Sequence, residues 1–209
     1  GVGIAGGNQS LNDNVFEQGD PSFIDASNNS LGSRNYKLST SSAAAIDKGD
    51  GTLTNNLDFD LNNLSRPQGG AYDYGAYEHQ NTWTGVINSD WSNSSNWSTN
   101  DVPVSGRSPI IADTSNQPII SSDDGSSGNV YLKDITINSS ASLTLNKEAS
   151  LTLSGNFSNS GTVTLNSDSD EFSSIIIHGT SSGNITYNRY VNSLTNGSGW
   201  DLIGSPVNG

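Results

Sequence analysis

The sequence predicts an all-β protein whose second half is a β-solenoid, and two observations lead to this prediction. Ser, Thr and Asn occupy 79 of the 209 positions, and another 23 are Gly. These residues disfavour helices, because Ser, Thr and Asn compete for backbone hydrogen bonds and Gly loses conformational entropy there. In addition, short apolar-Thr-apolar triplets recur between residues 135 and 187, an alternation that is typical of half-buried strands.

The triplets 135–137, 143–145 and 151–153 begin eight residues apart, with turns rich in Ser, Asn and Gly between them, and further strands are expected at 163–165, 175–177 and 185–187. Each triplet places two aliphatic side chains on one sheet face and Thr on the other. We interpret this short period as the signature of stacked coils that share one core. An up-and-down meander of hairpins would also give short alternating strands, but the near identity of the strands and the lack of a regular Asn-Gly turn favour a parallel solenoid.

The chain divides by composition into four sections. Residues 1–80 are irregular and rich in turns, and residues 81–128 form a joint with entry strands that carries three of the four Trp and three Pro. Residues 129–190 hold the solenoid repeats, and residues 191–209 are expected to begin a further, truncated module. Because the chain starts at Gly1 and contains no Met, we expect it to be an internal piece of a longer polypeptide.

Charge and cysteine content exclude several classes of function. The 21 acidic residues outnumber the 8 basic ones, giving a net charge of -13, which disfavours binding to nucleic acids and to anionic membranes. No stretch reaches the roughly 20 apolar residues of a membrane-spanning helix, so we expect no membrane insertion. The absence of Cys excludes disulfides, Cys-ligated zinc and thiol catalysis.

Residues 15–78 resemble a known family of folds. The motifs that carry the resemblance are Gly19–Asp25 (GDPSFID), Asn35–Leu38 (NYKL), Ser42–Gly49 (SAAAIDKG) and Asp73–Glu78 (DYGAYE). They resemble the string that closes the last coils of right-handed parallel β-helix proteins of the pectin-lyase-like superfamily, choice-of-anchor type, although Ala44 stands where the family usually has Pro. The resemblance implies that residues 1–80 are the last coils and the C-terminal cap of such a β-helix.

The second half is similar to a module of large secreted or surface proteins of Bacteroidota. The similar segments include Thr82–Gly85 (TWTG), Asp90–Trp97 (DWSNSSNW), Leu151–Phe157 (LTLSGNF) and Trp200–Pro206 (WDLIGSP). Proteins with this arrangement are exported by type IX secretion. The resemblance therefore implies a secreted or outer-surface location in a Gram-negative bacterium, with the type IX machinery and neighbouring modules of the same chain as partners.

One segment has the pattern of a calcium loop. Asp58, Asp60 and Asn62 place three oxygen ligands at alternate positions, as at the start of an EF-hand. The later positions hold Asn63 instead of Gly and Gly69 instead of a bidentate Glu, which excludes an EF-hand. A looser Ca²⁺ site and a set of solvated loop acids remain as the two interpretations, and the second is favoured. No other cofactor is required.

The aromatic residues Trp83, Trp91 and Trp97 also have two interpretations. They are candidates for a platform on which a sugar ring stacks, or for packing that covers the open end of a solenoid or joins two modules. Packing is favoured, because the end of a solenoid exposes apolar coils and unpaired strand edges that large aromatics cover efficiently.

Catalytic residues are not evident. His79 and His178 are the only histidines, and the basic residues are scattered singly, so no catalytic residue is predicted. We therefore expect a non-catalytic structural or adhesive segment of a large extracellular or cell-surface protein, in contact with polysaccharides or cell-surface glycans. The alternative is the rear portion of a β-helix polysaccharide lyase or glycoside hydrolase whose active site lies upstream of Gly1.

Overall fold

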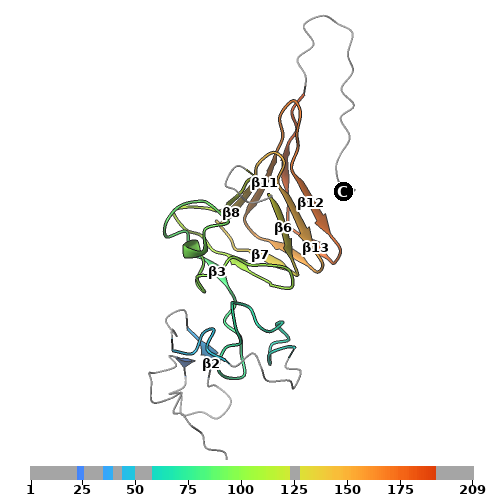
Figure 1. Ribbon diagram of the computed structural model, residues 1–209. Coiled ribbons are helices and arrows are strands. Elements are labelled where there is room, and N and C mark those ends of the chain that lie inside the picture. Colours follow the sequence, from blue (N-terminus) through green and yellow to red (C-terminus); the bar gives the residue numbers. More distant parts are fainter. Residues whose placement is uncertain (1–22, 26–34, 40–43, 50–57, 123–127, 192–209) are drawn as a thin grey trace, which may run out of the picture. The chain divides into compact units, whose positions relative to one another are not determined.

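The computed structural model describes residues 23–25, 35–39, 44–49, 58–122 and 128–191 (Figure 1). The chain divides into two compact units, residues 1–81 and 82–209, and each is described by itself. The regular structure in the described ranges is β-strand, apart from one turn of 3₁₀ helix at Ser94–Asn96. The predicted all-β class is confirmed. Among these same residues there is no helix with the length and apolar character needed to cross a membrane.

Unit 2 contains three parallel sheets (Figure 1). In hydrogen-bonded order, the first sheet consists of β3 (Thr82–Trp83), β4 (Ile110–Ile111), β7 (Ile135–Ile137), β10 (Phe157–Asn159) and β13 (Ser181–Ser182). The second consists of β5 (Ile119–Ile120), β8 (Ser142–Leu145), β11 (Thr162–Asn166) and β14 (Thr186–Asn188). The third consists of β6 (Asn129–Leu132), β9 (Ser150–Leu153) and β12 (Ser174–Ile177).

Consecutive strands along the chain lie in different sheets, so the chain winds as a three-sided coil. β4, β5 and β6 form one coil, β7, β8 and β9 the next, and β10, β11 and β12 the third, after which β13 and β14 begin another. Every pairing between these strands is parallel. This confirms the parallel β-solenoid and excludes the meander of hairpins, in which neighbouring strands would be antiparallel.

The register of the sheets shows what the eight-residue recurrence means. Ile135 pairs with Phe157, Leu143 with Val163, and Leu151 with Ile175, so these stacked positions are 20 to 24 residues apart in sequence. The three triplets that begin eight residues apart therefore lie on the three sides of one coil. Eight residues is the length of one side together with its corner.

The core of unit 2 is a column of aliphatic side chains in the interior of the coils. β8 and β9 have the same sequence, Ser-Leu-Thr-Leu, and their burial alternates. Both Leu of each strand are buried, whereas Ser and Thr are only half-buried. Leu145 stacks between Ile120 of the preceding coil and Leu165 of the following one. Because each coil shares its core with its neighbours, few apolar residues are enough to fill the interior.

Side-chain amides at the corners connect successive coils. Asn159, at the end of β10, accepts a hydrogen bond from the N–H of Gly161 in its own corner (2.9 Å) and donates one to the carbonyl of Asn184 in the next coil (2.6 Å). A Cβ atom at position 161 would overlap the carbonyl oxygen of Ala141 in the coil before, so this corner requires Gly. The side-chain amide of Asn188 likewise donates to the side-chain oxygen of Asn166 in the preceding coil, at 2.9 Å. The Asn and Gly of the turns therefore have defined places in the stack.

The stack begins at Thr82, within the section that the sequence suggested as a joint. β3, β4 and β5 belong to the same sheets as the later repeats, so residues 82–122 contribute to the solenoid despite their irregular sequence. Residues 192–209, where a further module is expected, lie outside the described residues.

Unit 1 contains two short strands in its described part. β1 (Phe23–Asp25) and β2 (Asn35–Leu38) form an antiparallel pair, and Leu38 packs with Ala45, Ile46 and Tyr74 in a small apolar cluster. Most of residues 1–57 lie outside the described ranges, so the assignment of residues 1–80 to the last coils and cap of a β-helix stays a prediction.

We expect Leu145→Ala to lower the free energy of unfolding by ~2–5 kcal/mol, because it opens a cavity between Ile120 and Leu165 in the column. The neighbouring Thr144, which is only half-buried, supplies the matched control, and Thr144→Ala should have a clearly smaller effect. Urea unfolding followed by circular dichroism measures both changes. Equal losses for the two variants would contradict the assignment of the inward and outward faces of β8.

Candidate functional site

The three tryptophans lie in the core of unit 2, in β3 and in the segment between β3 and β4. Trp83, Trp91 and Trp97 are 0%, 3% and 2% exposed. Trp97 contacts the other two edge-to-face, with ring centroids 5.1 and 4.7 Å away. Their indole N–H groups donate to the carbonyls of Asn116 (from Trp83, 2.7 Å) and Trp91 (from Trp97, 3.0 Å). Two of the three indole N–H groups are thus hydrogen-bonded within unit 2, as is usual for buried tryptophans.

This burial favours the packing interpretation of the tryptophans. A sugar-stacking platform needs an exposed ring face, and none of Trp83, Trp91 and Trp97 offers one in this structure. They are part of the hydrophobic core of unit 2, which is the packing interpretation. Contact of these three residues with glycans stays a prediction, which their burial disfavours.

A buried amide holds the loop that carries two of these tryptophans. The side-chain oxygen of Asn96 accepts from the N–H groups of Ile87 (2.9 Å) and Asn88 (3.1 Å), while its amide nitrogen donates to Asn88 (2.6 Å) and to the carbonyl of Asp90 (2.9 Å). Asn96 is fully buried, and its side chain ties the segment after Trp91 to residues 87–90 before it. Sequence analysis missed this role, since Asn is among the commonest residues of the chain.

The residues of the predicted calcium loop are arranged differently from a metal site. Asp60 is buried, and its carboxylate accepts three backbone N–H groups, from Asn62 (2.7 Å), Leu64 (2.8 Å) and Glu78 (3.1 Å). Asp58 and Asn62 are exposed. In the part of the chain that the structure describes, no group of three or more His, Asp or Glu side chains is placed to hold a metal ion. Asp60 therefore organises a turn in this structure, and a Ca²⁺ site at Asp58, Asp60 and Asn62 stays a prediction.

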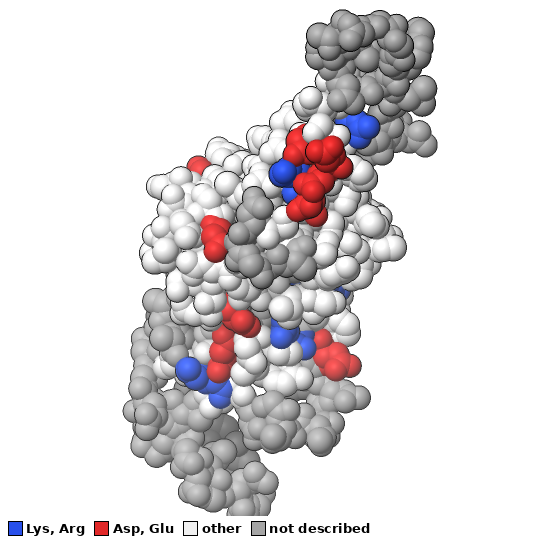
Figure 2. All heavy atoms as spheres, turned by 45° about the horizontal axis from the view of Figure 1, so that its top comes forward, with Lys and Arg blue, Asp and Glu red and all other residues white. Residues whose placement is uncertain are grey.

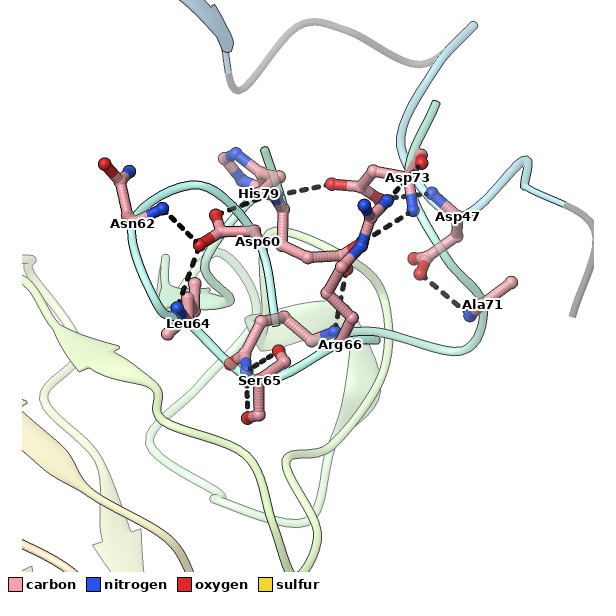
Figure 3. A network of polar contacts seen from close by, with 11 residues as sticks. Asp47, Asp60, Asn62, Leu64, Ser65, Arg66, Ala71, Asp73 and His79 are labelled. Carbon is pink, nitrogen blue, oxygen red and sulfur yellow. Dashed lines mark hydrogen bonds and ion pairs between the residues drawn. The ribbon is translucent and has the colours of Figure 1, made fainter. Parts of the chain in front are cut away.

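Unit 1 contains a buried ion pair next to this turn (Figure 3). The Nε of Arg66 donates to Oε1 of Glu78 at 2.7 Å, and the two side chains are 6% and 0% exposed. Glu78 also accepts the backbone N–H groups of Gln68 and Asp73, both at 3.0 Å. A second guanidinium nitrogen of Arg66 donates to the carbonyl of Asp73 at 2.9 Å. Both charges are thus paired and hydrogen-bonded, the condition under which burial of charge is tolerated.

The polar contacts around the Arg66–Glu78 pair form a network, in which Asp73 is the second residue with several hydrogen bonds (Figure 3). Its buried carboxylate accepts the backbone N–H of Asp47 at 2.8 Å and that of His79. Asp47 in turn accepts the N–H of Ala71 at 3.0 Å. Burial raises the pKa of Asp73 to about 7, against the lowering effect of the two N–H donors, and burial lowers the pKa of His79 below its usual value.

The network holds together three segments that are far apart in the sequence. Through Asp47, Asp60, Arg66, Asp73 and Glu78 it connects residues 44–49, 58–66 and 71–79. Asp73 and Glu78 belong to the string that resembles a closing β-helix motif, but the sequence alone does not show where their carboxylates converge. The arrangement explains the fold of this region, because its acidic groups accept hydrogen bonds from the protein's own backbone.

Acidic residues at the surface of unit 2 gather around one lysine (Figure 2). Lys147 pairs with Asp168 at 2.8 Å and with Glu171 at 3.4 Å, and Glu148 accepts a hydrogen bond from Ser122 at 2.8 Å. Lys147 lowers the pKa of Asp168 to about 2. These groups are exposed and therefore screened by solvent and salt. They behave as a surface turn, in which Asp168 accepts the backbone N–H groups of Asp170 (3.0 Å) and Glu171 (2.9 Å).

A shallow apolar groove lies beside β6 in unit 2. Its volume is about 350 Å³, at the lower end of the range of ~300–1,000 Å³ that is usual for ligand pockets. Trp91 and Val130 line it together with Val102, Pro103, Val104 and Tyr131, and Ser and Asn side chains complete the lining. No charged side chain of the described residues lines it. Sequence analysis did not single out this groove, because residues 102–105 and 129–131 are brought together only by the winding of the coil.

Comparisons with known proteins place the second unit in a family. Residues 82–209 match the model of a family described as "Domain of unknown function (DUF8693)". The match begins at the residue where unit 2 begins. No curated protein and no solved structure matches the chain.

We expect Glu78→Gln to destabilise unit 1 by ~3–5 kcal/mol, because it leaves the buried charge of Arg66 without its partner. Lys147→Ala is the control, since it removes an ion pair that is exposed to solvent and should change stability little. Hydrogen exchange of the backbone amides, read in unit 1 for Glu78→Gln and in unit 2 for Lys147→Ala, measures the two losses. An equally small effect of the two variants would contradict a structural role for the buried pair.

The stability of unit 1 should depend on pH through Asp73. Its pKa is about 7 in the folded chain but close to 3.8 when it is exposed. Between these pH values the folded chain keeps a proton that the unfolded chain has released, so the free energy of unfolding falls as the pH rises from about 4 to 7. His79 acts in the opposite sense, since its lowered pKa makes stability rise with pH up to about 6.5.

The two contributions can be separated with variants. In a His79→Gln background, the opening free energy of unit 1, measured by hydrogen exchange and corrected for intrinsic exchange rates, should decrease from pH 4 to pH 7. Adding Asp73→Asn should flatten this profile. A profile with the same slope in both backgrounds would show that Asp73 does not titrate in this range.

Proposed function

We propose that this chain, which belongs to the DUF8693 family, is a non-catalytic structural segment of a large extracellular or cell-surface protein, with unit 2 as a stiff spacer. The observation that carries the proposal is the set of three parallel hydrogen-bonded sheets around one continuous aliphatic column. A spacer needs a shape that holds without a partner or a ligand, and this architecture supplies it.

The stiffness follows from the direction of the hydrogen bonds. In a solenoid the bonds between strands run from coil to coil, so that each coil adds about 4.8 Å of length to the stack. Bending the stack would stretch the bonds of at least one sheet and open the shared core on that side. Each coil contacts only its neighbours, so length can grow by repetition without a change in the core.

The outer surface supports an extracellular role in contact with glycans. The outward positions of β8 and β9 are Ser and Thr, and the hydroxyl and amide groups of such a surface can form weak, repeated contacts with sugars. The net charge of -13 and the absence of Cys suit a soluble surface outside the cell that relies on no disulfide. Export by type IX secretion and attachment to neighbouring modules are part of the same proposal, and they rest on the resemblance.

Pulling the full chain from both ends in a single-molecule experiment tests the spacer role. We expect unit 2 to resist and then to yield in discrete steps that correspond to whole coils. Stacked positions in unit 2 are 20 to 28 residues apart, so one coil should release roughly 70–100 Å of chain at ~3.5 Å per extended residue. Leu145→Ala should lower the force of the steps.

Two results would contradict the proposal. A smooth extension at low force, with no step, would show that unit 2 bears no load. Turnover of any member of a panel of acidic and neutral polysaccharides, with and without Ca²⁺, would contradict a non-catalytic segment and favour the lyase or hydrolase alternative.

A further inference from the structure

The first strand of the third sheet has an open edge. In the first sheet β4 is preceded by β3, and in the second sheet Ile119 of β5 pairs with Asp90, while the N–H of Trp91 donates to Ile119 at 3.2 Å. In the third sheet β6 pairs with β9 on one side only. Within the described ranges, no strand pairs with its other side.

The pairing with β9 shows which backbone groups of β6 face the open side. Gly128 and Leu132 accept the N–H groups of Ser150 (2.8 Å) and Ser154 (3.0 Å). In a parallel ladder the backbone groups of alternate residues point to opposite sides. Val130 and Leu132 therefore face β9, whereas the N–H and C=O groups of Asn129 and Tyr131 face away from it. Lys133, the next residue of this second set, donates to the carbonyl of Arg107 at 2.8 Å, as the alternation requires.

These outward groups border the apolar groove. The opposite wall is the segment of Val102, Pro103 and Val104, and Pro103 has no backbone N–H with which to pair. Val104 is 55% and Tyr131 56% exposed. The groove thus combines a short row of hydrogen-bonding backbone groups with apolar surface on both sides.

The segment of residues 102–107 covers one end of this edge, through the bond of Lys133 to Arg107, but β6 itself lacks the sequence features that usually protect an open edge. Natural proteins block such edges with charged side chains, Pro or bulges. The four residues of β6, Asn-Val-Tyr-Leu, include no charge and no Pro, and the strand pairs with β9 in continuous register. An additional strand could therefore extend the third sheet here.

We propose that this groove binds an extended, uncharged or basic peptide segment of another protein, which adds as a strand to β6. The backbone of the segment would pair with the free groups of Asn129 and Tyr131, and alternate side chains would enter the groove. This is the β-augmentation mode, in which main-chain bonds give affinity and side-chain pockets give selectivity. The proposal is independent of the spacer role.

Charge determines which segments fit. The groove has no charged lining, so a charged side chain inside it would be desolvated without a partner. The net charge of -13 repels acidic segments and attracts those with basic flanks. The expected ligand is therefore an alternating Val/Thr-type segment flanked by Lys or Arg.

A synthetic peptide with the sequence Lys-Val-Thr-Val-Thr-Val-Lys is a suitable probe, tested by calorimetry against the full chain. We expect saturable binding that depends on the register of backbone N-methylation. Methyl groups on the N–H groups that face β6 should weaken binding at least tenfold, and methyl groups on the alternate set should leave it unchanged. Binding that is insensitive to the position of the methyl groups would overturn strand addition.

Two surface variants locate the site. Val104→Asp places a charge in the groove and should weaken probe binding at least tenfold. Val86→Asp is the matched control, because Val86 is exposed in the same unit but does not line the groove, and it should bind as the unchanged chain does. Circular dichroism verifies that both variants are folded. Equal binding by both variants would show that the probe binds elsewhere.

The remaining outcomes also decide the proposal. If the unchanged chain fails to bind the probe at millimolar concentration, the proposal is wrong. If a β-1,4-glucose hexasaccharide binds and is lost in Val104→Asp while the peptide does not bind, the groove is a sugar site and the peptide proposal is wrong.

Discussion

The parallel backbone ladder between successive coils is the interaction on which the rest of unit 2 depends. It fixes the register in which Leu145 stacks between Ile120 and Leu165, and this register creates the aliphatic column. The same register brings the corners of successive coils close together, so that Asn159 can bond the next coil and position 161 must be Gly. Core, corners and surface are thus consequences of one repeated backbone contact, which accounts for the sparse hydrophobic content of the chain.

Unit 1 is stabilised by a different principle. Its described apolar cluster is small, with three buried residues, whereas the carboxylates of Asp60, Asp73 and Glu78 accept backbone N–H groups from distant segments. Such a network depends on every member being satisfied. This explains why its residues are buried and paired, and why unit 1 should respond to pH far more than the aliphatic column of unit 2.

The strands could be predicted from the sequence because they follow from a local pattern. Contacts between residues that are distant in the sequence could not. The strands and their inward faces follow from apolar-Thr-apolar alternation, which is read within a few residues. The coil length did not follow, because the triplets at 135, 143 and 151 look alike although they lie on three different sides. The burial of Trp83, Trp91 and Trp97, the convergence of Asp47 with Asp73, and the groove beside β6 all join residues more than five positions apart, and no local pattern reports such contacts.

Hydrogen exchange of individual backbone amides in unit 2 tests the coil-to-coil ladder most directly, because exchange reports the opening of each hydrogen bond. The account predicts slow exchange in β7, β8 and β9, the coil that is covered on both sides. In β6 it predicts alternation, with Val130 and Leu132 protected and Asn129 and Tyr131 exchanging fast. Fast exchange throughout β8 and β9 would contradict the parallel stack, and uniform protection along β6 would contradict its pairing on one side only.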